Sequence, residues 1–397
     1  MFKKVGGPEK SFLSNNKIWM AVATLVGTIV GAGILGIPYV VANTGFLYGF
    51  FIIVGLGIAF LFLNLFTGEI VLRTKKQYQL TGYAEKYLGK KGKILMTFSL
   101  LISTYGALTA YLIGEGVIFH SLVGIGAPLL YTILFFLVSF FIIHRGVKAA
   151  GRTELILITL LLSIVIVMGF LSWDNLKWGN FTTLNLAKIF LPYGVVLFAF
   201  IGSPAIPEMQ EILGKEKKKM KNAIIIGSVI PIVLYIVFTF FVIGIVGLEQ
   251  FEVLGQNERI ATVALSIYSE PILGIFANIL AILTMFTSFL TLGIALVEIY
   301  EYDYKFSRRN AYLLAFSLPL FIALFNLTTF IGILGISGAL AGGLEGIIIT
   351  FMYWKAKKSV ERTPEYKLGM HRIVGSIIII MFALGIIYQV LTTLGLV

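Results

Sequence analysis

Four hydroxyl side chains fall on one face of a single apolar segment, and their spacing suits a cation. Counted from the first, the others follow at three, four and seven positions, and the set is Thr284, Thr287, Ser288 and Thr291. On a helix these offsets share one face, and oxygen ligands suit a hard cation such as sodium. Such hydroxyls also bond to their own preceding carbonyls or pack against neighbouring helices, so the residues alone leave both interpretations open.

Several carboxylates lie in or near apolar segments, where an ionisable group is a functional candidate by default. Glu208 directly follows a proline, so it is either an ordinary helix-starting residue or a coupling group. Glu345 lies in a glycine-rich segment and is a candidate gate or proton carrier. Glu115 falls near a segment end, which favours an interfacial role, whereas Glu69 is expected to pair with Arg73 one helical turn later.

The residue types that most metalloenzymes and thiol enzymes need are scarce. The chain has no cysteine and only three histidines, which are His120, His144 and His371. This composition rules out thiolate chemistry and disfavours zinc catalysis. No phosphate-binding loop, nucleophile elbow or zinc motif stands out. We therefore expect a protein that is not an enzyme, has no catalytic residues and needs no cofactor apart from a sodium ion.

The elements that must position these residues are membrane helices. Of the 397 residues, 58% are hydrophobic and only 13% are charged, which is far from the balance of a soluble domain. Apolar runs of roughly 20 residues recur, and that length crosses a hydrocarbon core. The sequence predicts an all-α integral membrane protein with about eleven spans, at residues 18–41, 46–72, 94–122, 127–144, 153–172, 188–212, 222–246, 271–299, 310–326, 329–353 and 373–396.

The basic residues predict the orientation of this bundle. With the amino terminus inside, all but three of the 31 lysines and arginines lie on the cytoplasmic side, and the exceptions are Lys177, Lys188 and Arg259. This distribution explains the net charge of +12 without a nucleic-acid partner. We expect a cell-membrane protein in contact with the lipid bilayer, with a cytoplasmic amino-terminal tail at residues 1–17 and an external carboxyl terminus. The sequence makes no prediction of oligomeric state.

One stretch between spans also has helical character. Residues 257–269 place apolar side chains at helical spacing, namely Ile260, Val263, Ala264 and Ile267. The pattern predicts an external amphipathic helix. It is either a gating lid or an ordinary surface helix.

Two spans carry interruptions that a lipid-facing helix would not tolerate. Residues 27–38 contain four glycines and a proline, and residues 200–207 contain Gly202, Pro204 and Pro207. The two breaks lie five spans apart, and an odd repeat length inverts the second half relative to the first. Paired breaks of this kind indicate the central site of an inverted-repeat transporter. Glycines that merely permit close helix packing are the alternative.

At these breaks the chain resembles a known family. Gly31-Ala-Gly-Ile-Leu-Gly-Ile-Pro-Tyr39 and Tyr193-Gly-Val-Val-Leu-Phe-Ala-Phe-Ile-Gly-Ser-Pro-Ala-Ile-Pro-Glu208 are similar to segments of the amino acid/auxin permease family, within the amino-acid/polyamine/organocation superfamily. The resemblance implies a LeuT-type fold, a 5+5 inverted repeat plus one additional helix. The repeats would span 18–172 and 188–353, and residues 373–397 would form the eleventh helix and external carboxyl terminus.

The resemblance also implies where an amino acid binds. Amides of Gly31, Ala32 and Gly33 would hold the substrate carboxylate at the positive end of a half-helix. The expected acceptors for the substrate ammonium are backbone carbonyls near Ile29, Leu197, Phe198 and Phe200. Gly202 and Ser203 would shape the space for the substrate side chain.

A cation site follows from the same resemblance. The second sodium site of LeuT-type transporters matches, by motif, Gly27, Val30, Thr284, Thr287 and Ser288. The first sodium site is expected to be absent, because Ile34 and Phe198 replace its asparagine and threonine. Some proton-coupled relatives place a lysine of span five in the second site, but residues 153–172 contain none, and Lys148 and Arg152 precede that span.

Taken together, these features predict a secondary active amino acid transporter, a sodium-coupled symporter of a neutral amino acid that works by alternating access. The uncharged segments beside the breaks favour a neutral substrate. Proton coupling through Glu208 or Glu345 is the alternative within transport. A non-transporting amino acid sensor is the alternative from another class.

Overall fold

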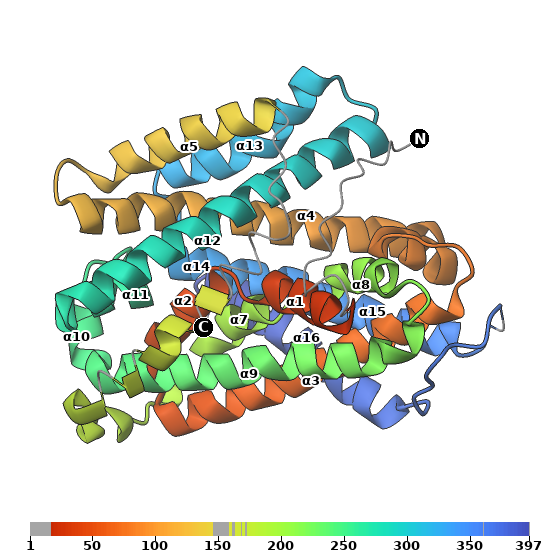
Figure 1. Cartoon of the computed structure of the whole chain (residues 1–397), viewed down its shortest axis with the longest axis horizontal. Helices are drawn as coiled ribbons and strands as arrows, with labels where there is room; N and C mark the ends of the chain where they lie inside the picture. Colours follow the sequence, from red (N-terminus) through yellow and green to blue (C-terminus); the bar gives the residue numbers. More distant parts are fainter. Residues whose placement is uncertain are drawn as a thin grey trace.

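The computed structural model describes residues 17–145, 159–160, 163–167, 169–170, 173–359 and 361–396, and these are helical with short connections (Figure 1). The expected tail at residues 1–16 lies outside the described residues. So do Lys148, Arg152 and much of the expected span at 153–172. The division into two repeats therefore stays a prediction.

The first span is broken, as the glycine-rich sequence predicts. Helix α1 (Lys17–Ile29) ends before residues 30–32, and α2 (Gly33–Thr44) continues at an angle of 54°. Pro38 lies inside α2 rather than at the break. The unwinding is thus confined to three residues, where the glycine content of the span leaves the helix weakest.

The next three helices run in alternating directions. They are α3 (Phe46–Arg73), α4 (Leu80–Val123) and α5 (Pro128–His144). Helix α4 begins well before the expected span at 94–122, because a polar stretch, residues 80–88, is also helical. The two parts meet at Gly89, whose φ of +75° is readily adopted only by glycine and turns the chain into the membrane span.

The second broken span consists of α7 (Leu191–Ala199), a 3-10 turn (Ser203–Ala205) and α8 (Ile206–Leu213). The remaining long helices are α9 (Met220–Ile245), α12 (Pro271–Glu298), α13 (Arg308–Leu324) and α16 (Arg372–Thr393). The span expected at 329–353 is not a uniform helix. It divides into α14 (Phe330–Ser337), a π-helical segment (Gly338–Gly342) and α15 (Gly343–Ala356).

The helices pack in two groups joined by α14 and α15 (Figure 1). In one group α3 packs on α9, α1 packs on α8 and α9, and α2 packs on α7. In the other group α4 packs on α5, α12 and α13. Helix α14 contacts both α4 and α7, and α15 contacts both α3 and α4, so these helices connect the broken spans to the second group.

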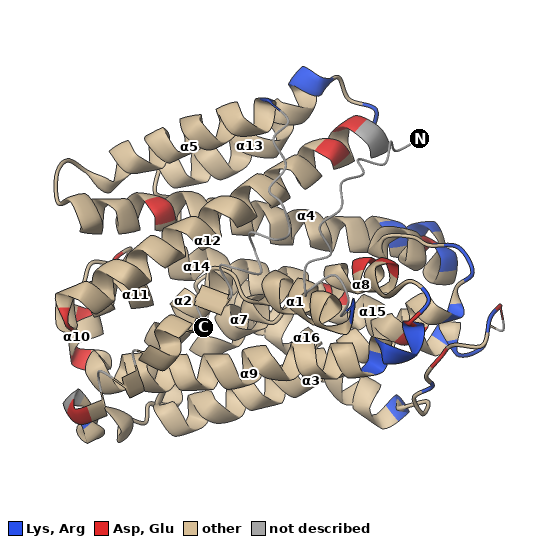
Figure 2. Cartoon of the chain, viewed as in Figure 1, with Lys and Arg blue, Asp and Glu red and all other residues tan. Residues whose placement is uncertain are grey.

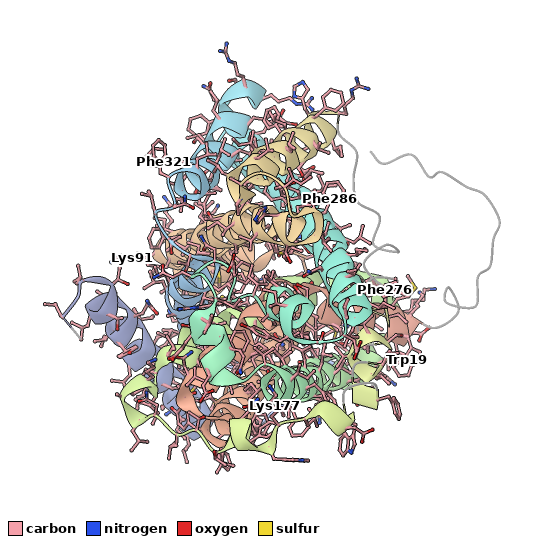
Figure 3. All side chains as sticks on the ribbon, turned by 90° about the vertical axis from the view of Figure 1, so that its left-hand side faces the viewer. Trp19, Lys91, Lys177, Phe276, Phe286 and Phe321 are labelled. Atoms are coloured by element: carbon pink, nitrogen blue, oxygen red, sulfur yellow. The ribbon has the colours of Figure 1, made fainter. Side chains whose placement is uncertain are left out.

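Length and composition identify the protein as a multi-pass integral membrane protein. Within the described ranges, seven helices are long and apolar enough to cross a bilayer, and the bent pair α1 and α2 makes an eighth. Helix α5 is apolar but has only 17 residues. Large side chains such as Trp19, Phe276 and Phe321 project from the rim of the bundle, where lipid would surround them (Figure 3). The count of eleven stays a prediction.

Most lysines and arginines gather at one end of the bundle, which we call the basic end (Figure 2). Buried Glu69 joins several elements there. Its carboxylate accepts from Arg73 at 2.7 Å, from Lys357 at 2.8 Å and from the Leu368 amide at 2.8 Å. The expected pairing of Glu69 with Arg73 is confirmed, and Lys357, directly after α15, and Leu368, before α16, extend it. These contacts clamp the α15–α16 connection over the end of α3.

Residues 359–371 make further contacts at the basic end. Glu361 bonds to Lys86 of α4 at 2.6 Å, and this hydrogen bond lowers the pKa of the Glu361 carboxyl, so the carboxyl stays ionised. The Arg362 guanidinium donates to the Leu72 carbonyl at 2.7 Å, and the Tyr366 hydroxyl donates to the Leu65 carbonyl at 2.6 Å. The connection therefore acts as a structural cap on α3 and α4.

We predict that Glu69→Gln destabilises the protein by about 3–5 kcal/mol, because two largely buried cations lose their shared, fully buried counterion. Glu85→Gln is the matched control. It removes the partner of Lys93 from a half-exposed pair, which is worth at most about 1 kcal/mol. Melting in detergent, followed by tryptophan fluorescence, should show a clear drop for Glu69→Gln only. Equal melting temperatures for the two variants would contradict the clamp.

Candidate substrate site at the paired breaks

The two breaks lie against each other. A Cβ added at Gly33 would stand 2.6 Å from the Cα of Ala199, the last residue of α7. A Cβ added at Gly202 would stand 2.5 Å from a side-chain carbon of Ile29, the last residue of α1. The absence of side chains at Gly33 and Gly202 therefore lets the two unwound segments meet.

Tyr235 of α9 holds the junction together. Its hydroxyl lies 2.9 Å from the Ile29 carbonyl and 2.8 Å from the Ala199 carbonyl, and the side chain is fully buried. Both carbonyls belong to residues at which a half-helix ends, where intrahelical donors run out. One side chain thus serves the backbone of both breaks.

The start of α2 is arranged to receive an anion. The amides of Ala32 and Gly33 stand at the beginning of this 12-residue helix, where amides have no intrahelical acceptor and the dipole is positive. A Cβ at Gly31 would meet only the Tyr111 hydroxyl, at 3.5 Å. Gly31 therefore faces Tyr111 of α4 across a space, whereas Gly33 is packed against α7.

The carbonyls expected to receive a substrate ammonium are partly engaged. The Leu197 carbonyl accepts from the Phe200 amide at 3.2 Å, and the Phe198 carbonyl accepts from the Ile201 amide at 3.3 Å. The Ile29 carbonyl accepts from the Gly31 amide at 3.1 Å in addition to Tyr235. A carbonyl oxygen has two lone pairs, so the Leu197 and Phe198 carbonyls can each accept a further hydrogen bond. The Ile29 carbonyl can do so only while Tyr235 donates to Ala199 instead.

A third irregular segment borders the site. The π-helical segment Gly338–Gly342 passes so close to α7 that a Cβ at Gly338 would stand 1.9 Å from the Gly194 carbonyl oxygen. Ser99 of α4 donates to the Ala341 carbonyl at 2.7 Å within this segment. Single π-helical turns inside α-helices are frequent at functional sites. The glycines of this span thus allow close contact with the second broken span.

Glu345 lies beside the second break, buried in a polar cluster. Ser203 interacts with the Glu345 carboxyl and donates to Asn64 of α3 at 3.2 Å. Asn64 in turn donates to Ser228 of α9 at 3.2 Å. Neither Glu345 oxygen makes a hydrogen bond of ordinary geometry to a described residue. Glu345 is therefore a carboxyl without a cationic partner, next to the expected substrate site.

The other two carboxylates differ from Glu345 in their surroundings. Glu208 is exposed in the first turn of α8, where it suits a helix start. Glu115 of α4 is fully buried, and its oxygens have no hydrogen-bond partner among the described residues. The expectation of an interfacial Glu115 was wrong, because α11 (Ala261–Tyr268) and α12 pack against α4 and enclose this residue.

The hydroxyls expected to bind a cation lie on α12, half-buried. Thr287 donates to the Leu283 and Thr284 carbonyls at 3.2 and 3.1 Å, and the buried Thr284 hydroxyl has no partner in the part of the chain described. Donation leaves the oxygen lone pairs available to a cation, so the residues fit the ion chemically. The other expected ligands, Gly27 and Val30, belong to α1 and its break, whose principal packing partners are α8 and α9. The cation site stays a prediction.

The helix expected at 257–269 is α11, preceded by a further helix, α10 (Gly247–Val253). Residues 261–265 are all buried, so α11 is packed into the bundle and is not an ordinary surface helix. Next to it, Arg259 donates to the Tyr39 hydroxyl of α2 at 2.8 Å. The segment therefore closes over α2 at the end of the bundle opposite the basic end.

The profile of the tryptophan/tyrosine permease family matches residues 14–392, nearly the whole chain. The chain belongs to the tryptophan/tyrosine permease family. The match names this family rather than the amino acid/auxin permease family, so the resemblance holds at the level of amino acid permeases. The permease is thus a member of a transporter family and not an enzyme.

Two relatives of known transport activity align with nearly the whole length of this chain. The permease is 26% identical over 391 residues to tyrosine-specific transport system 1 of Haemophilus influenzae, covering 94% of this chain and 95% of that protein. It is 24% identical over 370 residues to glutamine transporter 2 of Aliivibrio fischeri, covering 90% and 93%.

A solved structure shows the fold. The crystal structure of MhsT in complex with L-phenylalanine is similar with a TM-score of 0.64 and 18% identity, covering 98% of this chain and 100% of that one. The expected LeuT-type fold is confirmed by this similarity.

Sequence reasoning missed the residue that joins the breaks. Tyr235 is the single tyrosine of an apolar span, a pattern that equally indicates an interfacial aromatic. Two tyrosines of α4 differ in the same way, since Tyr111 faces the first break, whereas Tyr105 bonds to Tyr300 at 2.6 Å and to the Leu314 carbonyl. The depth of a tyrosine within its span is the signal that distinguishes Tyr235 from an interfacial aromatic, which would lie near the end of a span.

We predict that Gly31→Ala and Gly33→Ala act differently. A methyl at Gly31 has room beside Tyr111, so the variant should fold and lose substrate affinity by about tenfold or more, as the methyl enters the space reserved for the carboxylate. A methyl at Gly33 overlaps the α7 backbone and should lower the melting temperature. Substrate-dependent melting shifts measure both effects. Normal affinity in a well-folded Gly31→Ala variant would show that Gly31 serves packing alone.

Proposed function

We propose that the permease is a secondary active transporter of a neutral amino acid, with aromatic amino acids as its first candidate substrates. The junction of the two breaks carries the proposal. It combines the amides at the start of α2 with carbonyls at the end of α7, a pairing suited to the carboxylate and ammonium of one amino acid. The family name and the tyrosine-specific relative support the choice of aromatic substrates.

The same geometry supplies a route to alternating access. Each broken span has two half-helices joined by a short unwound segment, so one half can tilt while the other stays packed. The α2 half is held by α7, α9 and the closing segment around Arg259. The α1 half rests on α8 and α9. An amino acid bound between the halves would favour the state in which both contact it.

We propose sodium as the coupling ion. Its site would combine backbone oxygens near Gly27 and Val30 with the hydroxyls of Thr284, Thr287 and Ser288. The unpartnered Thr284 hydroxyl supports this assignment, because a buried hydroxyl without a bond is costly unless a ligand satisfies it.

Proton coupling is the second candidate, and Glu345 favours it. This carboxyl is buried beside Ser203 at the second break and has no cation near enough to pair with it in the described chain. A carboxyl in such a place can take up a proton from one side and release it to the other as the breaks open alternately. Glu208 is exposed and fits this role less well.

The two coupling modes can be separated in liposomes. With an inward sodium gradient at equal pH, we expect labelled tyrosine, tryptophan or phenylalanine to accumulate, and sodium and substrate to raise each other's affinity by the same factor. An inward proton gradient without sodium should drive no accumulation of these amino acids. Accumulation only in the second arrangement would contradict sodium coupling, and no uptake of any amino acid in either would contradict transport.

Two sets of variants assign the result to residues. Thr287→Ala combined with Ser288→Ala should weaken sodium binding by about tenfold or more while changing substrate affinity at saturating sodium little. Thr291→Ala, one turn away and exposed, is the control. If Glu345→Gln abolishes accumulation but Glu208→Gln does not, the proton mechanism is correct instead.

The proposed orientation places the basic end in the cytoplasm. Because the chain has no cysteine, single cysteines can be introduced cleanly. Leu396→Cys, after α16, should react with a membrane-impermeant maleimide on intact cells. Lys215→Cys, between α8 and α9, should react only after permeabilisation. Labelling of both from the same side would contradict the proposed orientation.

A further inference from the structure

A cavity of about 370 Å³ lies at the basic end, away from the two breaks. Leu88 from the start of α4 lines one side, and Phe351 and Trp354 from α15 line another. Lys355, Lys358 and Arg372 add three cations to the wall where α15 ends and α16 begins. The cavity thus lies between the start of α4 and the two consecutive helices α15 and α16.

The charges in this wall have one sign and no internal partners. Lys355, Lys358 and Arg372 are exposed, and within the described part of the chain none of the three takes part in an ion pair or donates a side-chain hydrogen bond. Lys357, between the two lysines, instead points to Glu69. No carboxylate lines the cavity. Three uncompensated cations around one cavity call for an anionic ligand.

The apolar surroundings identify what kind of anion fits. Phe351 is 43% exposed, and Ile373 and Ile377, on the first turns of α16, are 78% and 58% exposed. Trp354 has a buried indole Nε1 with no acceptor among the described residues. A cationic wall, an aromatic donor and an exposed apolar helix face therefore lie together where α15 ends and α16 begins. The same three features occur across the headgroup region of a bilayer.

We propose that this cavity binds the phosphate headgroup of an anionic phospholipid, with Lys355, Lys358 and Arg372 around the phosphate. The acyl chains would lie along the exposed face of α16 beside Ile373 and Ile377. A free phosphate would satisfy the cations but leave the apolar face uncovered, so the lipid fits the whole surface.

Lipid binding at this place has a structural consequence. The α15–α16 connection that closes over Glu69 begins and ends at the cavity, at Lys358 and Arg372. A headgroup bridging these two residues holds both ends of the connection. Anionic lipid should therefore stabilise the basic end of the folded protein.

The test uses the purified full-length protein in a neutral detergent with three additions, namely phosphatidylglycerol, phosphatidylcholine and inorganic phosphate. Native mass spectrometry counts bound lipid, and melting reports stabilisation. We expect phosphatidylglycerol to bind and to raise the melting temperature, and the other two to do neither. Each basic residue near an anionic lipid raises the affinity for that lipid about fivefold. Lys355→Gln, Lys358→Gln and Arg372→Gln combined should therefore weaken lipid binding on the order of 100-fold.

Lys215→Gln, Lys218→Gln and Lys221→Gln combined form the matched control, since these residues are exposed at the same end and line no part of the cavity. Equal loss of lipid in both triple variants, or none in either, would overturn the proposal. Equal effects of inorganic phosphate and phosphatidylglycerol would show a soluble-anion site instead. If the first triple variant melts too low to measure, Lys358→Gln alone should still lose about fivefold in affinity, and unchanged affinity there would overturn the proposal.

Discussion

The constraint on which this structure depends is that backbone groups inside a bilayer must find hydrogen-bond partners within the protein. Two spans are unwound at depth, and each unwound segment lies against protein rather than lipid. The first meets the end of α7, the second meets Ile29, and Tyr235 contacts the carbonyls of both. The π-helical segment follows the same rule, since Ser99 donates to one of its carbonyls. Close packing of the half-helices is therefore a condition for having the breaks.

The buried carboxylates show two ways of placing a charge in this fold. Glu69 has two cations and an amide around it, at the end of the bundle where a cap can be built. Glu345 and Glu115 lie deeper and have no cation beside them among the described residues. An ionised carboxyl without partners is costly in such surroundings. Paired Glu69 therefore serves the architecture of the basic end, whereas Glu345 and Glu115 contribute no ion pair to the described part of the fold.

Much of this arrangement is predictable from composition and periodicity. Glycine and proline clusters locate both breaks to within a few residues, because few other residues weaken a helix so strongly. The start of α4, the π-helical segment and α10 are not predictable in this way, because hydropathy reports lipid contact and these segments contact protein or water. Tyr235 and the enclosure of Glu115 depend on which helices become neighbours. A single sequence does not contain that information in local form.

The Tyr235 hydroxyl carries one proton, yet two carbonyl oxygens lie within 3 Å of it. It can donate fully to Ile29 or to Ala199, but not to both at once. At every moment one of the two half-helix ends therefore keeps a carbonyl with spare capacity to accept a hydrogen bond. A rotation of one O–H bond moves that capacity from the first broken span to the second. Even with its backbone fixed, the junction thus has two hydrogen-bonding states, which differ in the direction of the Tyr235 O–H bond. A primary ammonium that reaches the junction would find a carbonyl acceptor in either state.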